Sequence, residues 1–241
     1  MAGHSKWKNI LHKKEKTDAQ RAKLFTKLSR EIIVAVKEGG PDPASNARLK
    51  DVIAKAKAGN VPNDNINRVI QKAAGGGSDA NYESNTYEGY GPGGVAVIVE
   101  TMTDNKNRTA SEMRHYFDKY GGNLGATGCV SWSFKRKGIL VVEREGRSED
   151  ELMMQALDAG ASDFEPLDDV FEITTEPDDF APCRDALEEA GVIFLSAELE
   201  LIPDTYVTLA DEEQVKQMQK LLDLLEENDD VQNVFHNWEE A

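Results

Sequence analysis

The glycine run Gly75-Gly76-Gly77 separates two parts of the chain that have different hydrophobic periods. Before the run, apolar residues recur every three or four positions, as they do in amphipathic helices. Beyond it, short apolar stretches bounded by glycine and proline are typical of strands. This change of period predicts a helical domain over residues 1–77, followed by α/β structure.

Three helices are expected in the first part of the chain. The first begins at the capping residue Asp18 and ends at Gly39, the second ends near Gly59, and the third begins near Pro62. The positions expected to face inward are Phe25, Leu28, Ile32, Val36, Leu49, Val52, Ile53, Ala56, Ile66, Val69, Ile70 and Ala73.

The order of elements beyond the glycine run predicts two ferredoxin-like modules. Residues 138–203 have the order strand, helix, strand, strand, helix, strand, which is that of the split βαβ unit. Residues 82–134 give two strands, a helix and a strand at 130–134, and the C-terminal tail adds a strand, a helix and a strand. Residues 78–137 plus 204–241 are therefore expected to form one discontinuous module that carries the other as an insertion. The predicted class is α+β, with three domains.

Charge is also distributed unevenly along the chain. The formal net charge of −16 argues by itself against a polyanionic partner. Residues 1–75, however, hold 16 lysines and arginines against 7 acidic residues, whereas residues 138–241 hold 5 against 30. This asymmetry predicts a polyanion-binding segment joined to acidic modules.

The most basic segment is an N-terminal arm that is too polar to bury a face. Lysines neutralise phosphates and an indole offers a stacking face, which is the usual combination for binding nucleic acid. The alternative is a solvated tail whose tryptophan packs on the first helix. The candidate binding residues of the arm are Lys6, Trp7, Lys8, Lys13, Lys14 and Lys16.

Further basic residues lie opposite the apolar positions of the first and third helices. They would extend the positive surface of the arm, although each is equally compatible with an ordinary solvated helix face. These candidate nucleic-acid-binding residues are Lys23, Lys27, Arg30, Arg68 and Lys72.

Patterns that would indicate catalysis, a metal or a cofactor are missing from the sequence. Cys129 and Cys183 lack the spacing of a zinc site or a disulfide framework. The stretch 121–128 lacks the G-K-[ST] ending of a phosphate loop and is expected to form turns. Acidic pairs such as Asp229-Asp230 lack the ligand spacing of a calcium loop and are expected on solvated faces. No nucleophile has a recognisable base nearby, so we expect a protein that is not an enzyme and has no cofactor.

Localisation signals are also missing. No run approaches the roughly 18 apolar residues of a membrane span, and the basic N-terminus lacks the apolar stretch of a secretory signal. We therefore expect a cytoplasmic protein with no membrane partner.

Several motifs closely resemble those of the YebC/PmpR family, and the match runs along the whole chain in order. They are Ala2-Gly3-His4-Ser5-Lys6-Trp7 with Asn9-Ile10, then Asp18, Arg21, Phe25-Thr26-Lys27-Leu28, Arg30-Glu31-Ile32, Asn46-x-x-Leu49, Pro62-x-Asp64-Asn65-Ile66, Tyr87-Glu88-Gly89-Tyr90-Gly91-Pro92-Gly93-Gly94 and Asp104-Asn105-x-Asn107-Arg108. Leu11 departs from the resemblance, because the family often has a basic residue there. One phosphate contact would then be missing.

The resemblance implies a helical N-terminal domain and two α/β domains, one inserted in the other. It also implies a function. Members of the family are classed as cytoplasmic transcriptional regulators that bind promoter DNA, while other members, including mitochondrial relatives, resemble translation factors that act on ribosomes stalled at proline-rich stretches.

Three hypotheses follow. The leading one is a DNA-binding transcriptional regulator. The alternative is a ribosome-associated translation factor that contacts ribosomal RNA. The third is a protein–protein adaptor, whose acidic modules would face basic partners such as ribosomal proteins or polymerase subunits.

Overall fold

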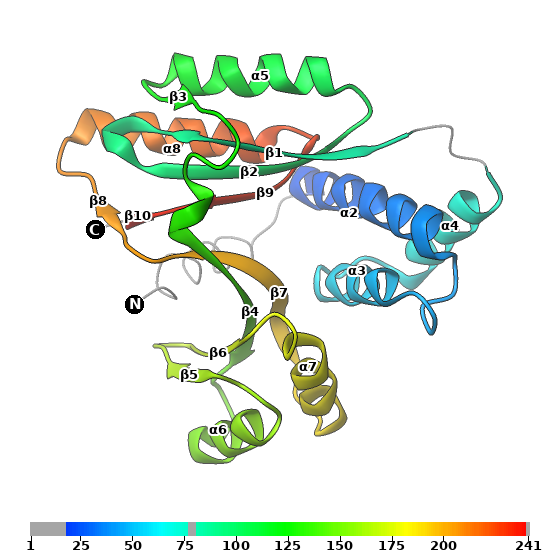
Figure 1. Cartoon of the computed structure of the whole chain (residues 1–241). Coiled ribbons are helices and arrows are strands. Elements are labelled where there is room, and N and C mark those ends of the chain that lie inside the picture. The colour runs from blue at the N-terminus through cyan, green and yellow to red at the C-terminus, as the bar shows by residue number, and fades with distance from the viewer. Residues whose placement is uncertain (1–17, 77–80, 240–241) are drawn as a thin grey trace. The chain divides into compact units, whose positions relative to one another are not determined.

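The structure is a computed structural model of the chain and describes residues 18–76 and 81–239. It divides into two compact units (Figure 1). Residues 135–202 form one unit, and the described residues 18–76, 81–134 and 203–239 form the other. The α+β class predicted from the sequence is confirmed.

The larger unit begins with a bundle of helices. Leu28 and Ile32 of the first helix pack with Leu49 of the second and Ile66 of the third, and all four side chains are buried. The helices are α2 (Asp18–Gly39), α3 (Ala47–Ala58) and α4 (Asn63–Ala74). Their amphipathic pattern is what allows three short helices to share one core.

Asn46 fixes the connection between α2 and α3. Its side-chain oxygen accepts a hydrogen bond from the backbone N–H of Leu49 at 3.0 Å and so caps α3. Its amide nitrogen donates to the carbonyl oxygens of Ala35 and Gly40, both at 2.8 Å. One buried side chain therefore satisfies the backbone at the end of one helix and at the start of the next.

The same unit contains a four-stranded antiparallel sheet in the order β3-β1-β2-β9. Its strands are β1 (Glu83–Tyr90), β2 (Ala96–Thr103), β3 (Asn123–Leu124) and β9 (Val231–His236). Its two helices are α5 (Lys106–Lys119) and α8 (Glu212–Glu227), and the 3₁₀ turn η1 (Pro92–Gly94) joins β1 to β2. A short parallel pair, β8 (Val207–Thr208) with β10 (Trp238–Glu239), completes the unit.

Helices α5 and α8 cover the same face of this sheet (Figure 1). Val97 and Val99 of β2 point into the core, where they meet Phe117 of α5 and Leu221 of α8. Residues 95–124 and 207–238 thus share one hydrophobic core, although the second unit separates them in the sequence. Burying these apolar side chains from both segments is what holds the discontinuous unit together.

The inserted unit has the sheet order β5-β6-β4-β7. Since β6 is antiparallel to both β4 and β5, those two strands are parallel and β6 splits the βαβ unit that they form with the helix between them. The elements are β4 (Phe134–Glu143), α6 (Glu149–Asp158), β5 (Asp163–Pro166), β6 (Val170–Thr175), α7 (Phe180–Glu189) and β7 (Phe194–Pro203).

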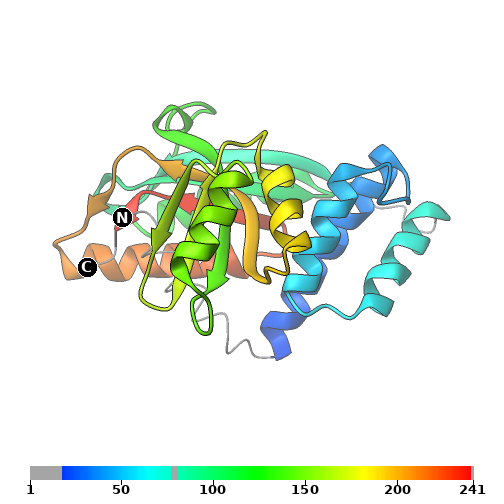
Figure 2. The same ribbon diagram turned by 90° about the horizontal axis from the view of Figure 1, so that it is seen from below.

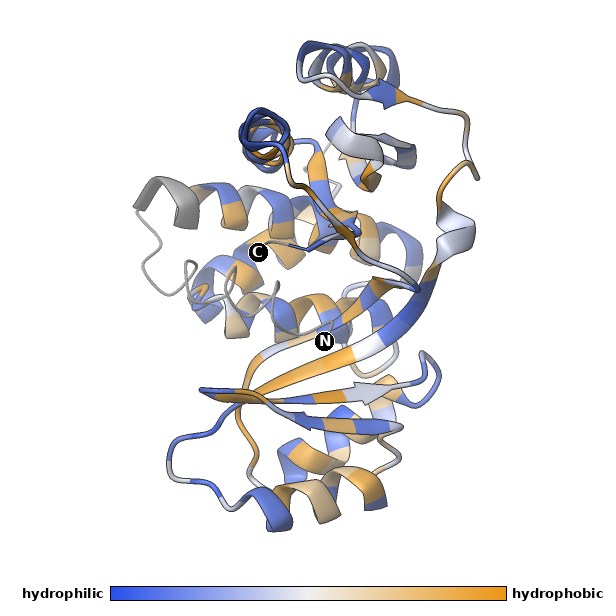
Figure 3. Cartoon of the chain, turned by 90° about the vertical axis from the view of Figure 1, so that its left-hand side faces the viewer, coloured by the Kyte–Doolittle hydropathy of each residue, from blue (hydrophilic) through white to orange (hydrophobic). Residues whose placement is uncertain are grey.

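Both helices of this unit lie on one face of its sheet (Figure 2). Leu140 and Val142 point toward the helices, whereas Ile139 and Val141 point to the opposite face and pack with Val170. The period of two along β4 explains this division. Figure 3, coloured by hydropathy, shows that the helices also carry both apolar and polar residues along their length.

The predicted strand over residues 130–134 is wrong. Residues Ser131–Ser133 form a 3₁₀ turn, η2, and the edge of the sheet is occupied by β3 instead. The reason is that the carboxylate of Glu88 accepts the backbone N–H groups of Gly128, Val130 and Ser131. Donors that are satisfied by a side chain cannot pair with a neighbouring strand.

None of the helices within residues 18–76 and 81–239 has the length and apolar character needed to cross a membrane.

Candidate nucleic-acid interface

The arm residues predicted to bind nucleic acid lie outside the residues that the structure describes. This applies to Lys6, Trp7, Lys8, Lys13, Lys14 and Lys16. Their role therefore remains a prediction from charge and composition.

Arg68 and Lys72 lie one turn apart on the exposed face of α4. Ile66 and Ala73 are buried on the opposite face, which fixes the direction in which the two cations point. The guanidinium of Arg68 donates to the side-chain oxygen of Asn65 at 3.1 Å. Both positive charges are thus available at the surface, as the sequence predicts.

Amide side chains extend this face of α4. Asn67 and Gln71 are exposed and, at about 100° per residue, lie beside Arg68 and Lys72 within an arc of about 140°. Asp64 lies within the same arc, in the first turn, where a negative charge is favourable for the helix dipole. We call Asp64, Asn67, Arg68, Gln71 and Lys72 the α4 face. It combines two cations with two amides that can both donate and accept hydrogen bonds.

Lys23 and Lys27 of α2 are directed to the C-terminal end of α8. The amine of Lys23 donates to the carbonyl oxygen of Glu227 at 3.2 Å, and that of Lys27 to the carbonyl oxygen of Glu226 at 3.0 Å. The last turn of α8 has no basic residue of its own. The two lysines therefore supply the positive charge that a helix C-terminus favours.

Arg30 is also engaged within the molecule. One of its guanidinium nitrogens, Nη1, lies 2.7 Å from Oδ1 of Asp230, 2.8 Å from the carbonyl oxygen of Asp229 and 3.1 Å from that of Met102. The guanidinium also lies over the ring of Tyr82, 5.3 Å from its centroid. With its side chain only 15% exposed, Arg30 joins α2 to the sheet rather than presenting its charge to a phosphate.

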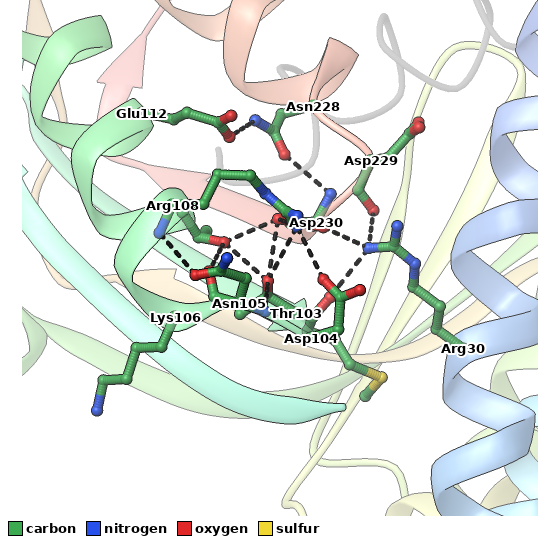
Figure 4. Close-up of polar contacts among 12 residues, drawn as sticks. Arg30, Thr103, Asp104, Asn105, Lys106, Arg108, Glu112, Asn228, Asp229 and Asp230 are labelled. Carbon is green, nitrogen blue, oxygen red and sulfur yellow. Dashed lines mark hydrogen bonds and ion pairs between the residues drawn. The ribbon is translucent and has the colours of Figure 1, made fainter. Parts of the chain in front are cut away.

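Asp230 is the centre of this junction (Figure 4). Besides Arg30, its carboxylate accepts hydrogen bonds from Arg108 at 2.7 Å, from Thr109 at 2.7 Å and from Thr103 at 3.1 Å. Thr103 ends β2, whereas Arg108 and Thr109 begin α5. The carboxylate thereby holds four elements together: α2, β2, α5 and the turn that leads into β9.

Neighbouring side chains fix the position of Asp230. Asn105 caps α5 by accepting the backbone N–H of Arg108 at 3.1 Å. Asn228 accepts the backbone N–H of Asp230 at 2.8 Å and donates to Glu112 at 2.8 Å. The network therefore reaches from the start of α5 to its middle.

These contacts set the ionisation of the cluster. Burial raises the pKa of Asp230, but the hydrogen bonds from Arg108, Thr109, Arg30 and Thr103 outweigh it and lower the pKa to about 2. Hydrogen bonds to Asp230 and Asp104 raise the pKa of Arg108. Burial and the charge of Asp230 also raise the pKa of Tyr87. Asp230 is thus held as a carboxylate throughout the neutral range.

The shift predicts how stability depends on pH. Because the folded-state pKa of Asp230 is lowered from 3.8 to about 2, its stabilising contribution is complete above about pH 4 and is lost as the pH falls to about 2. Urea unfolding measured at a series of pH values should show this loss, and the carboxyl ¹³C resonance of Asp230 should titrate near pH 2. A titration midpoint near 4 would contradict the network.

The expectation that Asp229-Asp230 forms a solvated acidic face is wrong for Asp230. Its side chain is only 5% exposed, while the neighbouring Asp229 is exposed and contributes its backbone carbonyl. Nothing in the local sequence distinguishes the two aspartates. The signal that could have indicated the junction was the motif Asp104-Asn105-x-Asn107-Arg108, which contains Arg108 and the capping residue Asn105.

Among residues 18–76 and 81–239, no group of three or more histidine, cysteine, aspartate or glutamate side chains is arranged to hold a metal ion.

A helical module followed by two sheet-and-helix modules, one inserted in the other, defines a multidomain α+β protein. Two family profiles match this organisation. The TACO1/YebC protein N-terminal domain matches residues 5–76, and the TACO1/YebC second and third domain matches residues 82–238. The chain belongs to the TACO1/YebC family.

Similar proteins are found over the full length of the chain. Proteins named "Probable transcriptional regulatory protein" from Acetivibrio thermocellus and Caldicellulosiruptor bescii are 60% and 59% identical to it, with at least 99% of each chain covered. The crystal structure of a conserved hypothetical protein from Aquifex aeolicus has a TM-score of 0.83 and 49% sequence identity, covering 93% of this chain and 92% of the other.

Proposed function

We propose that the chain is a cytoplasmic, non-enzymatic transcriptional regulator that binds DNA through its N-terminal domain. The observation that carries this proposal is the α4 face, where Arg68 and Lys72 are exposed beside Asn67 and Gln71. The positive charge of residues 1–75 and the names of the similar proteins support it further.

The α4 face has the chemistry that a DNA-reading helix needs. Lysine and arginine neutralise phosphates, and arginine can also bond the O6 and N7 atoms of guanine in the major groove. Asparagine and glutamine can bond the N6 and N7 atoms of adenine. An α-helix fits the width of that groove, so α4 would lie in it while the lysines of the arm contact the backbone.

The cations of α2 have a different role in this proposal. Lys23, Lys27 and Arg30 contact α8, Asp229 and Asp230, so they position the helical module instead of binding phosphates. The acidic residues beyond 138 would repel nucleic acid and so direct the basic module toward it, or they would face basic protein partners.

A salt titration tests the DNA-binding proposal. If about six phosphates are neutralised, the logarithm of the association constant should fall with the logarithm of salt concentration with a slope near −5. The double variant Arg68→Gln/Lys72→Gln should make that slope shallower by about 2.

The matched control is Lys216→Gln/Lys220→Gln, which removes the same charge from an exposed position on α8. It should leave the slope unchanged. An equal change in both double variants would show that only net charge matters, and a flat response of the wild type would favour the adaptor hypothesis.

Crosslinking in cells separates transcription from translation. We expect the N-terminal residues to crosslink to promoter DNA. Crosslinks confined to ribosomal RNA would contradict this proposal and support the translation-factor alternative. That alternative also requires binding to a polyanion.

A further inference from the structure

The segment between the end of α5 and the start of β4 differs in charge from the rest of the chain. From Lys119 to Phe134 there is no acidic residue, although the chain contains 44 of them. The segment contains the glycines of the stretch 121–128 and the 3₁₀ turn η2, between the labels β3 and β4 in Figure 1. The side chains of this segment therefore contribute no negative charge that would repel an anionic partner.

Glu88 holds residues 125–131 in a loop through hydrogen bonds to their backbone. One carboxylate oxygen accepts the backbone N–H of Gly128 at 2.8 Å, and the other accepts those of Val130 and Ser131 at 3.0 and 2.9 Å. The backbone carbonyl of Glu88 accepts the N–H of Gly125 at 2.8 Å. Burial raises the pKa of Glu88, but these backbone hydrogen bonds outweigh it and lower the pKa. Because Glu88 is buried, its carboxylate serves to hold the loop.

Glycine is required at two positions for the loop to close. Gly128 has a φ of +89°, which other residues rarely adopt. A Cβ at Gly125 would lie 2.5 Å from the sulfur of Cys129. The conformation is therefore specified by the sequence and anchored by a buried carboxylate.

The loop presents Trp132 to solvent. The indole is 76% exposed, yet its Nε1 donates to the carbonyl oxygen of Cys129 at 3.0 Å, which restricts the ring. The hydroxyl of Tyr90, another exposed aromatic residue, donates to the same carbonyl at 3.3 Å. Two aromatic side chains thus converge on one backbone oxygen. An exposed indole held in one orientation offers a flat apolar face that another planar ring can cover.

We propose that Trp132 stacks on an unpaired base of single-stranded nucleic acid, at a site separate from the α4 face. The proposal rests on the proposed nucleic-acid-binding function and extends it. An indole stacks on any base and needs one face of that base to be open, which a duplex does not offer. The absence of acidic residues from 119 to 134 favours a nucleic acid over a basic protein. One acidic residue close to the loop is Asp204, whose backbone N–H donates to the carbonyl oxygen of Ser133.

The test compares Trp132→Ala, Trp132→Phe and wild type for binding to a short oligothymidylate, to the same strand with abasic sites, and to a duplex. One stacked base predicts about a 5- to 150-fold loss of affinity for the oligothymidylate in Trp132→Ala. Trp132→Phe should retain most of the affinity. On the abasic strand and on the duplex the three proteins should bind alike.

Ile193→Ala is the matched control, because Ile193 is 77% exposed and lies in the other unit. It should bind the oligothymidylate as the wild type does. Trp132→Ala binding as tightly as the wild type, or losing affinity equally on the abasic strand, would overturn the stacking proposal while the proposed function stands. Failure of the wild type to bind any of the three probes would instead overturn the proposed function.

Discussion

Replacing Asp230 by asparagine is expected to lower the free energy of unfolding by about 3 kcal/mol. The carboxylate accepts from Arg30, Arg108 and two threonine hydroxyls, and its side chain is buried. Asparagine has a single acceptor oxygen, and its amide would face donors. Arg30, which is largely shielded from water, would then lose the counter-charge of Asp230, whereas Arg108 would keep that of Asp104. Urea unfolding at neutral pH, followed by circular dichroism, measures the loss.

Asp229→Asn is the matched control, because it removes the same charge one residue away. Asp229 contacts Arg30 through its backbone carbonyl, which the substitution keeps. Its effect should lie within about 0.5 kcal/mol of zero. A double-mutant cycle between Arg30→Gln and Asp230→Asn should give a coupling free energy of about 0.5–3 kcal/mol. If the two aspartate variants were equally stable, Asp230 would not be the centre of the junction.

Turning the lysines of the arm into glutamine is expected to weaken binding to nucleic acid by about 100-fold or more near 0.1 M salt. The variant changes Lys6, Lys8, Lys13, Lys14 and Lys16 together. Each phosphate contact that is lost removes about 0.9 from the salt slope. If the arm makes about four of the six contacts and the α4 face the other two, the slope should become shallower by about 3 to 4. Fluorescence anisotropy of a labelled duplex at several salt concentrations measures both quantities.

The stability of this arm variant serves as its first control and should match that of the wild type. A second control changes Lys23 and Lys27 of α2 to glutamine. Because these lysines contact the end of α8, their loss should lower the free energy of unfolding. The salt slope should change little. An arm variant that kept full affinity for both DNA and ribosomes would show that the arm is not the polyanion-binding segment.

The local elements could largely be predicted from the sequence because their signals are local. The glycine at position 39 ends α2 as expected, and the period of apolar residues identified the helices that share the N-terminal core. The strand expected at 130–134 failed because a side chain distant in the sequence, Glu88, takes the backbone donors of that segment. The hydrophobic pattern alone does not show that a distant side chain will accept these backbone hydrogen bonds.

For the candidate site too, the sequence predicts what is local to a helix and misses what depends on distant residues. Arg68 and Lys72 lie on an exposed face because the apolar stripe of α4 already determines which side is buried. The same reasoning placed Lys23, Lys27 and Arg30 opposite the apolar stripe of α2, which is correct for the helix by itself. It could not show that α8 and Asp230 contact that opposite side of α2, because the contacting residues are separated from α2 by about 200 positions in the sequence.

The sequence by itself determined the helices, the class of the fold and the separation of charge, because helix periodicity, capping and composition are properties of neighbouring residues. Tertiary structure alone decided which charges remain at the surface. A carboxylate such as Asp230 is buried only because three other elements, α2, β2 and α5, bring it enough donors to offset its loss of water. That balance depends on long-range packing, which separates Asp230 from Asp229 although the two residues are neighbours.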